Sequence, residues 1–368
     1  MNGPLPRAIA WAKTMRGHGE GVVTAHRDSH AQVQPQRPRR REQREELERL
    51  SLNPAATFAS GAGDRAQPEE PCEFRTCFER DRDRIVHSAS FRRLAGKTQV
   101  VVHPTDHQRT RLTHAIEVAQ CAVAMARGVG GNISLTEAMA LGHDCGHGPG
   151  GHASEDAFDA FLPQGYDHGP WGADVVLAEL NLTAQTLDGI RNHSWSRPAP
   201  ATLEGELVSW ADRIAYCAHD LEDAIQAGIV TVDELPSVVT EVVGTTRREQ
   251  LARFLGAVIE TTMSTGTVGM DASTAEALAV LRRFNYERIY TRPESVAQSR
   301  TVVKVLQGLV EYFLAHPDTL PEEYRTEDAT WGIVTYVGGM TDRFAFDHAE
   351  RLLGWDRGRL PKGIGRGA

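Results

Sequence analysis

The sequence predicts an all-α fold. Apolar residues recur at the three-four spacing of buried helix faces in most segments after residue 74. An alternating strand pattern is confined to residues 97–103, where a short hairpin is expected. With 368 residues, the chain can form a large core and one or two domains. We expect a poorly ordered polar tail over residues 1–70, a helical core over 71–232, and a helical C-terminal region over 233–368 that packs on the core.

The predicted tail is rich in Arg, Gln, Pro, Gly and Ser, a composition that does not favour a packed core. It carries a basic cluster at Arg37, Arg39, Arg40 and Arg41. No aromatic residues interleave with these arginines, so a solvated tail is favoured over a nucleic-acid-binding arm. Residues 42–50 predict a short charged helix that closes the tail.

The first long helix is expected over residues 111–127, where apolar side chains share one face. Glycines at 128, 130 and 131 end it. Residues 134–137 match a capping box and predict the start of a second helix, which leads to His143-Asp144. A glycine-rich bend follows, and a third helix is expected to begin near Ala153. Further helices are expected over residues 205–227, 244–263, 273–289, 296–315 and 331–353.

Bulk composition argues against several classes of protein. Forty basic and 49 acidic residues give a formal net charge of −9, which does not indicate nucleic-acid binding. No apolar run has the length of a membrane span, and the first residues lack the apolar stretch of a signal peptide. The five cysteines are an odd, scattered set, which favours reduced thiols over a disulfide framework. We therefore expect a cytoplasmic protein without a membrane partner.

The adjacent pair His143-Asp144 is the most informative feature of the chain, because an imidazole and a carboxylate together can hold a divalent metal. His114 upstream and Asp212 downstream are the candidates to complete the set. A lone histidine in an apolar helix is more often a hydrogen-bonded core residue than a ligand. Here the ordered set, with its members on separate predicted helices, favours one metal per site. Nitrogen and oxygen ligands without a thiolate suit Mn, Mg, Fe, Co or Ni.

Further polar residues follow the His-Asp pair. His147, His152 and Glu155 lie beside it in sequence, and His168 is a further candidate for the same pocket. Because His152 and Glu155 are three residues apart at a predicted helix start, Glu155 is expected to orient the His152 imidazole. The glycine-rich turn lets the backbone approach a phosphate, although no Gly-Lys-Ser/Thr follows and it is not a P-loop.

Arginines supply a predicted anion-binding element. A group of four precedes His114, and Arg213 follows Asp212; the group is Arg92, Arg93, Arg109 and Arg111. Planar bidentate donors suit phosphate oxygens. On the helix predicted after residue 205, Asp212, Tyr216 and Asp220 are spaced at i, i+4 and i+8 and share one face.

These segments resemble the HD-domain phosphohydrolases, and within them the deoxynucleoside triphosphate triphosphohydrolases of the dGTPase group. The resemblance covers most of residues 74–300. It is carried by FERDRDRIVHSASFRRL from Phe78, RTRLTHAIEVAQ from Arg109, the His-Asp segment, DRIAYCAHDLEDA from Asp212 and YTRPE from Tyr290. The resemblance implies a helical HD domain with a helical C-terminal elaboration, and hydrolysis of a dNTP to deoxynucleoside and inorganic triphosphate.

The resemblance also implies roles for individual residues. The metal ligands would be His114, His143, Asp144 and Asp212. The catalytic pair would be His152 and Glu155, with His147 and His168 beside the phosphates. Phosphate contacts would come from Arg111 and Arg213, and deoxyribose contacts from Gln99, Tyr216 and Asp220. A ring-like homo-oligomer, most often a hexamer, and a nucleotide effector are further expectations of the resemblance.

Two other functions stay open at this point. The first is another HD phosphohydrolase, such as a nucleotide phosphodiesterase or a (p)ppGpp hydrolase, although the latter resemble one another in having Glu-Asp where this chain has His147-Gly148. The second is a metal-bound nucleotide-sensing or nucleic-acid-binding protein. Acid-base residues such as His152 and Glu155 beside a metal argue against a sensor, because sensing alone does not require them.

Overall fold

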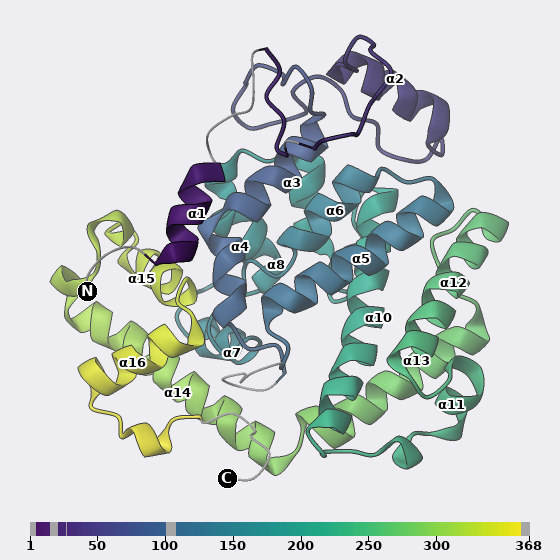
Figure 1. Cartoon of the computed structure of the whole chain (residues 1–368). Helices are drawn as coiled ribbons and strands as arrows, with labels where there is room; N and C mark the ends of the chain where they lie inside the picture. Colours follow the sequence, from purple (N-terminus) through teal and green to yellow (C-terminus); the bar gives the residue numbers. More distant parts are fainter. Residues whose placement is uncertain (1–4, 15–20, 27, 101–107, 362–368) are drawn as a thin grey trace. The chain divides into compact units, whose positions relative to one another are not determined.

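The computed structural model describes residues 5–14, 21–26, 28–100 and 108–361. These residues form helices and no strand, so the predicted all-α class is confirmed (Figure 1). The expected hairpin lies partly outside the described residues; over residues 97–100 no strand forms, and Thr98 makes only an isolated bridge to Thr110. None of the described helices is both long and apolar enough to cross a membrane.

The chain divides into two compact units, residues 1–39 and 40–368. In the first unit, α1 (Pro6–Thr14) has no buried residue. The second unit contains α2 (Arg41–Ser51), α3 (Cys77–His87), α4 (Ala89–Arg93), α5 (Arg111–Val129), α6 (Ile133–Gly142), α7 (Ala153–Asp159), α8 (His168–Trp171), α9 (Ala184–Asn192), α10 (Leu203–Gln226), α11 (Ser237–Val243), α12 (Arg247–Thr265), α13 (Ala272–Asn285), α14 (Pro293–Ala315), α15 (Ala329–Gly338) and α16 (Asp342–Leu353).

Two predicted helix boundaries are wrong. The capping residue of α6 is Asn132, whose side chain accepts a hydrogen bond from the Leu135 amide; Glu137, expected in a capping box, forms an ion pair with Arg82 instead. The helix predicted over residues 331–353 is two helices, α15 and α16, because Thr341 caps a new start by accepting a hydrogen bond from the Phe344 amide.

Residues 40–70 differ from the tail that the sequence predicts, because they belong to the second unit. The expected charged helix is present as α2, and Ala59 after it is fully buried. The Arg65 guanidinium lies 2.6 Å from the Asp81 carboxylate, and both side chains are buried. This segment is held by polar and ionic contacts rather than by an apolar periodicity, so its sequence pattern resembled that of a tail.

The second unit has two apolar cores. The first is built on α5, α6 and α10, which pack against one another, and includes α3, α12 and α13. The second joins α7 and α8 to α14, α15 and α16. Helices α11–α13 therefore share a core with the segment before residue 232, whereas α7 and α8 share a core with the chain's last helices.

Candidate metal centre and active site

His143 and Asp144 lie at the end of α6, inside the first core, and both are buried. The His143 Nδ1 is 2.7 Å from the Ala140 carbonyl oxygen, and since a carbonyl only accepts, Nδ1 carries the hydrogen. The opposite nitrogen, Nε2, has no hydrogen-bond partner. A buried imidazole fixed in this way presents a lone pair to a metal.

Helices α5 and α10 bring His114 and Asp212 to the same place. The His114 Nε2 is 3.1 Å from Asp212 Oδ1, and the His143 Nε2 is 3.6 Å from the same oxygen. One ligand atom from each of these three residues lies within 4.8 Å of the others. The Asp144 Oδ1 is 3.5 Å from His143 Nε2. The four predicted ligands therefore converge, and this buried His/Asp set could hold a divalent metal.

The cluster favours positive charge. Burial lowers the pKa of the His143 imidazole, but the carboxylates of Asp144 and Asp212 outweigh that effect and raise the pKa to about 9. Burial alone would raise the pKa of the Asp144 carboxyl, yet Arg111 and the neighbouring histidines hold it well below its usual value. A cation is the natural partner for such a site.

Arg111 lies directly beneath the glycine-rich turn. Its Nη1 is 2.7 Å from Asp144 Oδ2, whereas Nε and Nη2 have no hydrogen-bond partner although they are buried. A Cβ atom at Gly151, whose φ is +65°, would come within 2.6 Å of Nη2, so the turn must be glycine at this position. The arginine therefore keeps donors for an anion at the floor of the pocket.

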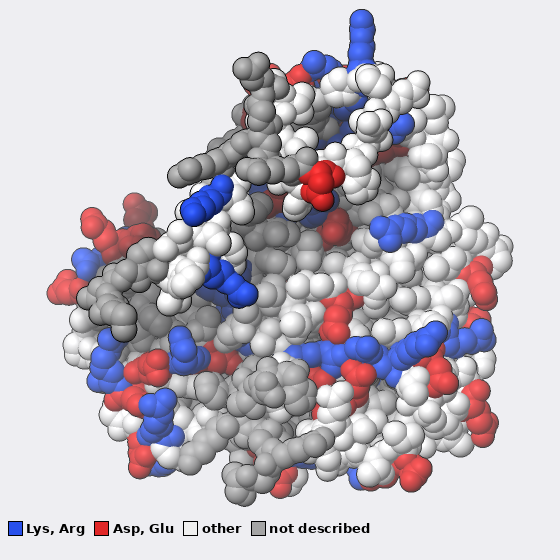
Figure 2. Space-filling model, in the orientation of Figure 1, with Lys and Arg blue, Asp and Glu red and all other residues white. Residues whose placement is uncertain are grey.

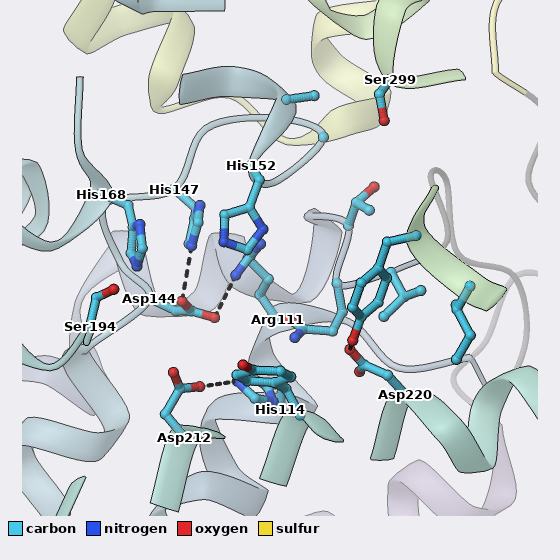
Figure 3. Close-up of a pocket in the computed structure, with 18 of the residues that line it drawn as sticks. Arg111, His114, Asp144, His147, His152, His168, Ser194, Asp212, Asp220 and Ser299 are labelled. Carbon is cyan, nitrogen blue, oxygen red and sulfur yellow. Dashed lines mark hydrogen bonds and ion pairs between the residues drawn. The ribbon is translucent and has the colours of Figure 1, made fainter. Parts of the chain in front are cut away.

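Three histidines of the following segment approach Asp144 from the other side of the pocket (Figure 3). The His147 Nε2 is 3.2 Å from Asp144 Oδ1, and its ring stacks on His168 with centroids 3.7 Å apart. Burial and the charge of Arg111 hold the pKa of His147 well below its usual value. His152 is exposed. Desolvation by the surrounding groups and the charge of Arg111 lower the pKa of its imidazole.

The hydrogen-bond partner of Glu155 is His168 and not His152, although the Glu155 charge acts to raise the pKa of His152, as the sequence predicts, against the larger effects of burial and Arg111. The Glu155 Oε1 lies 2.5 Å from His168 Nδ1 and also accepts from the His168 backbone amide. His152 is the N-cap of α7 and its carbonyl accepts from the Glu155 amide at 3.0 Å, so the two residues are neighbours in the first turn, but the Glu155 carboxylate is taken by His168. Although burial raises it, the contact with His168 lowers the pKa of Glu155 to about 2.

His193, at the end of α9, was not predicted. Its Nδ1 lies 2.8 Å from the Ile190 carbonyl oxygen, the same arrangement that fixes His143, and its Nε2 is 3.1 Å from the His168 Nε2. One ligand atom of His193 lies within 4.8 Å of His143 and Asp144 ligand atoms. The position of His193 directly after a helix, which His143 shares, is the sequence feature from which it could have been predicted.

The metal cluster opens into a cavity of about 460 Å³. Gln99, Arg213, Tyr216 and Asp220 line it, as predicted from the sequence. Asp220 is buried, with the Tyr290 hydroxyl 2.5 Å from Oδ2, and burial raises the pKa of its carboxyl to about 7. Lining residues that were not predicted include His193, Ser194, Trp195, Arg282, Tyr290 and Ser299.

Arginines contribute differently from the sequence prediction. The Arg213 guanidinium lies 3.6 Å from the centre of the Trp195 ring, a cation–π contact at the cavity wall. Arg109 points away and forms ion pairs with three carboxylates, those of Glu117, Glu222 and Asp223. Neither it nor Arg92 or Arg93 lines the cavity, so the predicted anion-binding cluster is reduced to Arg111 and Arg213.

Comparisons with known proteins agree with this site. The HD domain matches residues 111–217, and the phosphohydrolase-associated domain matches residues 268–351. A deoxyguanosinetriphosphate triphosphohydrolase-like protein of Caldanaerobacter subterraneus subsp. tengcongensis is 39% identical over 316 residues, which cover 83% of this chain and 93% of that protein. One from Clostridium perfringens (strain 13 / Type A) is 37% identical over 332 residues, covering 85% and 97%. The chain is thus a metal-dependent phosphohydrolase, and it belongs to the HD-domain family of deoxyguanosinetriphosphate triphosphohydrolase-like proteins.

Proposed function

We propose that the protein hydrolyses deoxynucleoside triphosphates, dGTP or several dNTPs, to deoxynucleoside and inorganic triphosphate. The proposal rests on the buried His/Asp cluster, which lies at the floor of a cavity large enough for a nucleotide. Side chains that can bind phosphate oxygens line one side of this cavity, and side chains that can contact a sugar line the other. The names of the two relatives support the same substrate class.

His114, His143, Asp144 and Asp212 would hold one divalent cation, such as Mn, Mg, Co, Fe or Ni. The unpartnered His143 Nε2 and the oxygen-rich surroundings fit such an ion. When bound, the ion neutralises charge on a phosphate group and so lowers the barrier to attack.

The triphosphate would lie between Arg111 and the histidine group. Arg111 has two unpartnered buried nitrogens for phosphate oxygens, and the Arg213 guanidinium lies over the Trp195 ring. His147 and His168 would contact the same phosphates from the opposite wall. Fixed donors of this kind stabilise charge that develops during the reaction.

Water would attack the α-phosphorus, and the 5′-oxygen would leave with a proton from His152. Arg111 and desolvation lower the pKa of His152 in the free enzyme, so its imidazole starts neutral. The anionic substrate raises this pKa on binding, and His152 thereby gains the proton that the leaving oxygen needs. Glu155 would act through His168, which it contacts, rather than through His152.

Gln99, Tyr216 and Asp220 would face the deoxyribose. The Tyr216 hydroxyl accepts a hydrogen bond from Arg282 Nε at 2.8 Å, which fixes the ring at the cavity wall. The Asp220 Oδ1 has no hydrogen-bond partner and could accept from a sugar hydroxyl. Held in this position over the sugar, Tyr216 would exclude the 2′-hydroxyl of a ribonucleotide.

Product identification tests the proposal. The full chain is incubated with Mn²⁺ and each of the four dNTPs, with GTP as the ribonucleotide control, and the products are separated by chromatography. We expect deoxynucleoside and intact triphosphate. Pyrophosphate or monophosphate would instead indicate one of the other HD phosphohydrolases, and absence of turnover with every dNTP would favour a nucleotide sensor. Mixtures of two dNTPs in the same assay reveal a nucleotide effector through activation.

A nucleic-acid-binding role has less support. On the face shown in Figure 2, basic side chains lie among acidic ones rather than forming one basic surface.

The proposal also includes the assembly state and the place of action. By family resemblance the protein would form a homo-oligomer, a hexamer. It would act in the cytoplasm, where it would control dNTP pools. Light scattering coupled to size exclusion tests the subunit number.

A further inference from the structure

The Arg213 guanidinium lies on an aromatic side chain at the cavity wall. Its central carbon is 3.6 Å from the centre of the Trp195 ring, and both residues line the cavity. The Arg213 Nε is buried without a hydrogen-bond partner, whereas Arg109 forms ion pairs with three carboxylates. Within the described part of the chain, Arg213 is therefore held by an aromatic face rather than by an ion pair.

Trp195 follows α9 and is fixed against α10 by two contacts of its own. Its indole N–H donates to the Ser209 carbonyl at 3.1 Å, about one helical turn before Arg213. Its ring meets the Trp210 ring with the centres 4.8 Å apart and the planes at 79°. Trp195 is still 45% exposed. The indole is therefore a fixed surface that runs along one turn of α10 and reaches the cavity.

This contact controls where the donors of Arg213 point. The five N–H groups of a guanidinium lie in its plane, so an aromatic ring over one face leaves them free to donate. A long side chain without such a contact samples many rotamers and loses that freedom when a ligand binds. Burial lowers the pKa of the Arg213 guanidinium, and the charge of Arg282 lowers it further. An anion in the cavity would offset both effects, so the arrangement favours an anionic ligand.

We propose that Trp195 is a positioning residue for the substrate, because it holds the Arg213 guanidinium in the plane in which its N–H groups reach the triphosphate. The inference rests on the proposed function, in which Arg213 contacts the phosphates, and it adds the residue that fixes this contact. The one donor of the indole is taken by the Ser209 carbonyl. Trp195 therefore has no N–H for a phosphate oxygen and acts through Arg213.

A double-mutant cycle tests this dependence on Arg213. Binding of inorganic triphosphate to the full chain is measured by isothermal titration calorimetry in matched Mn²⁺ buffer, for the wild type, Trp195→Leu, Arg213→Gln and the double variant. We expect Trp195→Leu to weaken binding about tenfold through loss of the cation–π contact. The double variant is expected to bind as weakly as Arg213→Gln alone, because two residues that act through one contact do not have additive effects.

Trp355→Leu is the matched control. The Arg359 guanidinium lies 6.0 Å from the centre of the Trp355 ring, and neither residue lines the cavity, so we expect the affinity of the wild type. If Trp195→Leu does not fold by circular dichroism, Trp195→Gln serves instead, since its amide can donate to the Ser209 carbonyl but offers no aromatic face. The same loss of about tenfold is then expected.

Three results overturn the proposal. The first is unchanged affinity in a folded Trp195 variant, or a wild type that does not bind triphosphate. The second is a double variant in which the two losses add, because the indole would then act independently of Arg213. The third is an equal loss of affinity in Trp355→Leu, which would show a general effect of destabilisation.

The dNTP assay separates this proposal from the proposed function. Trp195→Leu is expected to raise KM about tenfold and to leave kcat unchanged, because a contact of this kind is made equally in the ground state and the transition state. A lower kcat at unchanged KM overturns the positioning role. The expected cycle in calorimetry without release of deoxynucleoside from any dNTP refutes the proposed hydrolysis alone. Normal release by the wild type with additive losses in the cycle refutes the role of Trp195 alone.

Discussion

At the scale of single residues, the orientation of each imidazole decides what it can do. His143 and His193 each use Nδ1 to hold a backbone carbonyl three residues earlier, which turns Nε2 toward the centre of the site. His152 has no such anchor; it is exposed to the cavity beside the cluster. His143 and His193 are therefore fixed in orientation by their backbone contacts, whereas His152 is not.

This difference predicts that two substitutions affect the metal content differently although both reduce turnover. Asp212→Ala removes an oxygen that lies within reach of both His114 and His143, so we expect loss of the bound metal and of dNTP turnover. His152→Ala is expected to keep the metal content of the wild type and to lose turnover by about 10²-fold or more, the usual contribution of an acid-base group. Elemental analysis and steady-state kinetics check both. Unchanged metal content in Asp212→Ala, or full turnover in His152→Ala, would contradict the assignments.

Asp220 gives a prediction about pH. Burial raises the pKa of its carboxyl from near 3.8 to about 7, so the folded protein holds this proton more tightly than the unfolded chain. The resulting stabilisation is complete below about pH 4 and is lost as the pH rises through about 7. Asp220→Asn keeps an oxygen for Tyr290 and cannot ionise. Between pH 4 and 8 we expect the wild type to lose a few kcal/mol of unfolding free energy relative to Asp220→Asn, at about 1.4 kcal/mol per pKa unit. Urea unfolding at both pH values measures this difference, and parallel pH curves would refute it.

Much of the site followed from residue type and spacing. The four ligand candidates could be selected because they form an ordered set in apolar helical segments: His114 and Asp212 stand on α5 and α10, and His143 and Asp144 directly follow α6. The hydrogen-bond partner of Glu155 could not be predicted from the sequence. The choice between His152 and His168 depends on a bend that returns α8 to the start of α7. A Cβ at Gly146 would lie 1.9 Å from the His168 carbonyl oxygen, which shows how closely that return passes.

At the scale of elements, the start of α16 is tied to the active-site loop. The buried Asp342 accepts hydrogen bonds from the Gly150 amide at 2.8 Å and from the amide and hydroxyl of Thr98. The buried Lys97 side chain donates to the His147 and Gly338 carbonyls. The last helices therefore position the glycine-rich turn that lines the cavity, through a contact over nearly 200 residues that local sequence patterns do not encode.

Asp342→Ala tests this connection. It removes the acceptor of the buried Gly150 amide, which costs about 1–3 kcal/mol, and frees the turn to shift. We expect a lower melting temperature, unchanged metal content and a loss of turnover of about tenfold or more. Asp328→Ala is the control, because Asp328 caps the neighbouring α15 but contacts only the Trp331 amide in that cap. Equal losses of turnover in both variants would show a general effect of destabilisation.

At the scale of the whole chain, elements far apart in sequence share each core. The long helices could be predicted because their apolar faces are periodic, as in α5 and α10. The packing of α7 against α14 in one core could not be predicted, since it is a long-range contact. The start of the second unit was also hidden, because buried ionic contacts anchor it and these leave no periodic pattern.

Two N-terminal deletions locate the start of the folded unit. Removing residues 1–39 takes away only the first unit, whose helix α1 buries no residue, so we expect the melting temperature and metal content of the full chain. Removing residues 1–70 also takes away α2, the buried Ala59, and Arg65, which leaves the buried Asp81 without its ion-pair partner. Loss of one partner of a buried pair costs about 3–5 kcal/mol, a large part of the stability of a typical protein.

We therefore expect the deletion of residues 1–70 to unfold cooperatively at a much lower temperature or to be recovered as aggregate. Asp81→Asn in the deleted chain is the matched variant, because it removes the uncompensated charge and should restore part of the lost stability. Differential scanning calorimetry on the full chain, the two deletions and the deleted chain with Asp81→Asn measures these effects. Equal melting temperatures for the two deletions would place the boundary of the folded unit at residue 70, where the composition of the sequence changes.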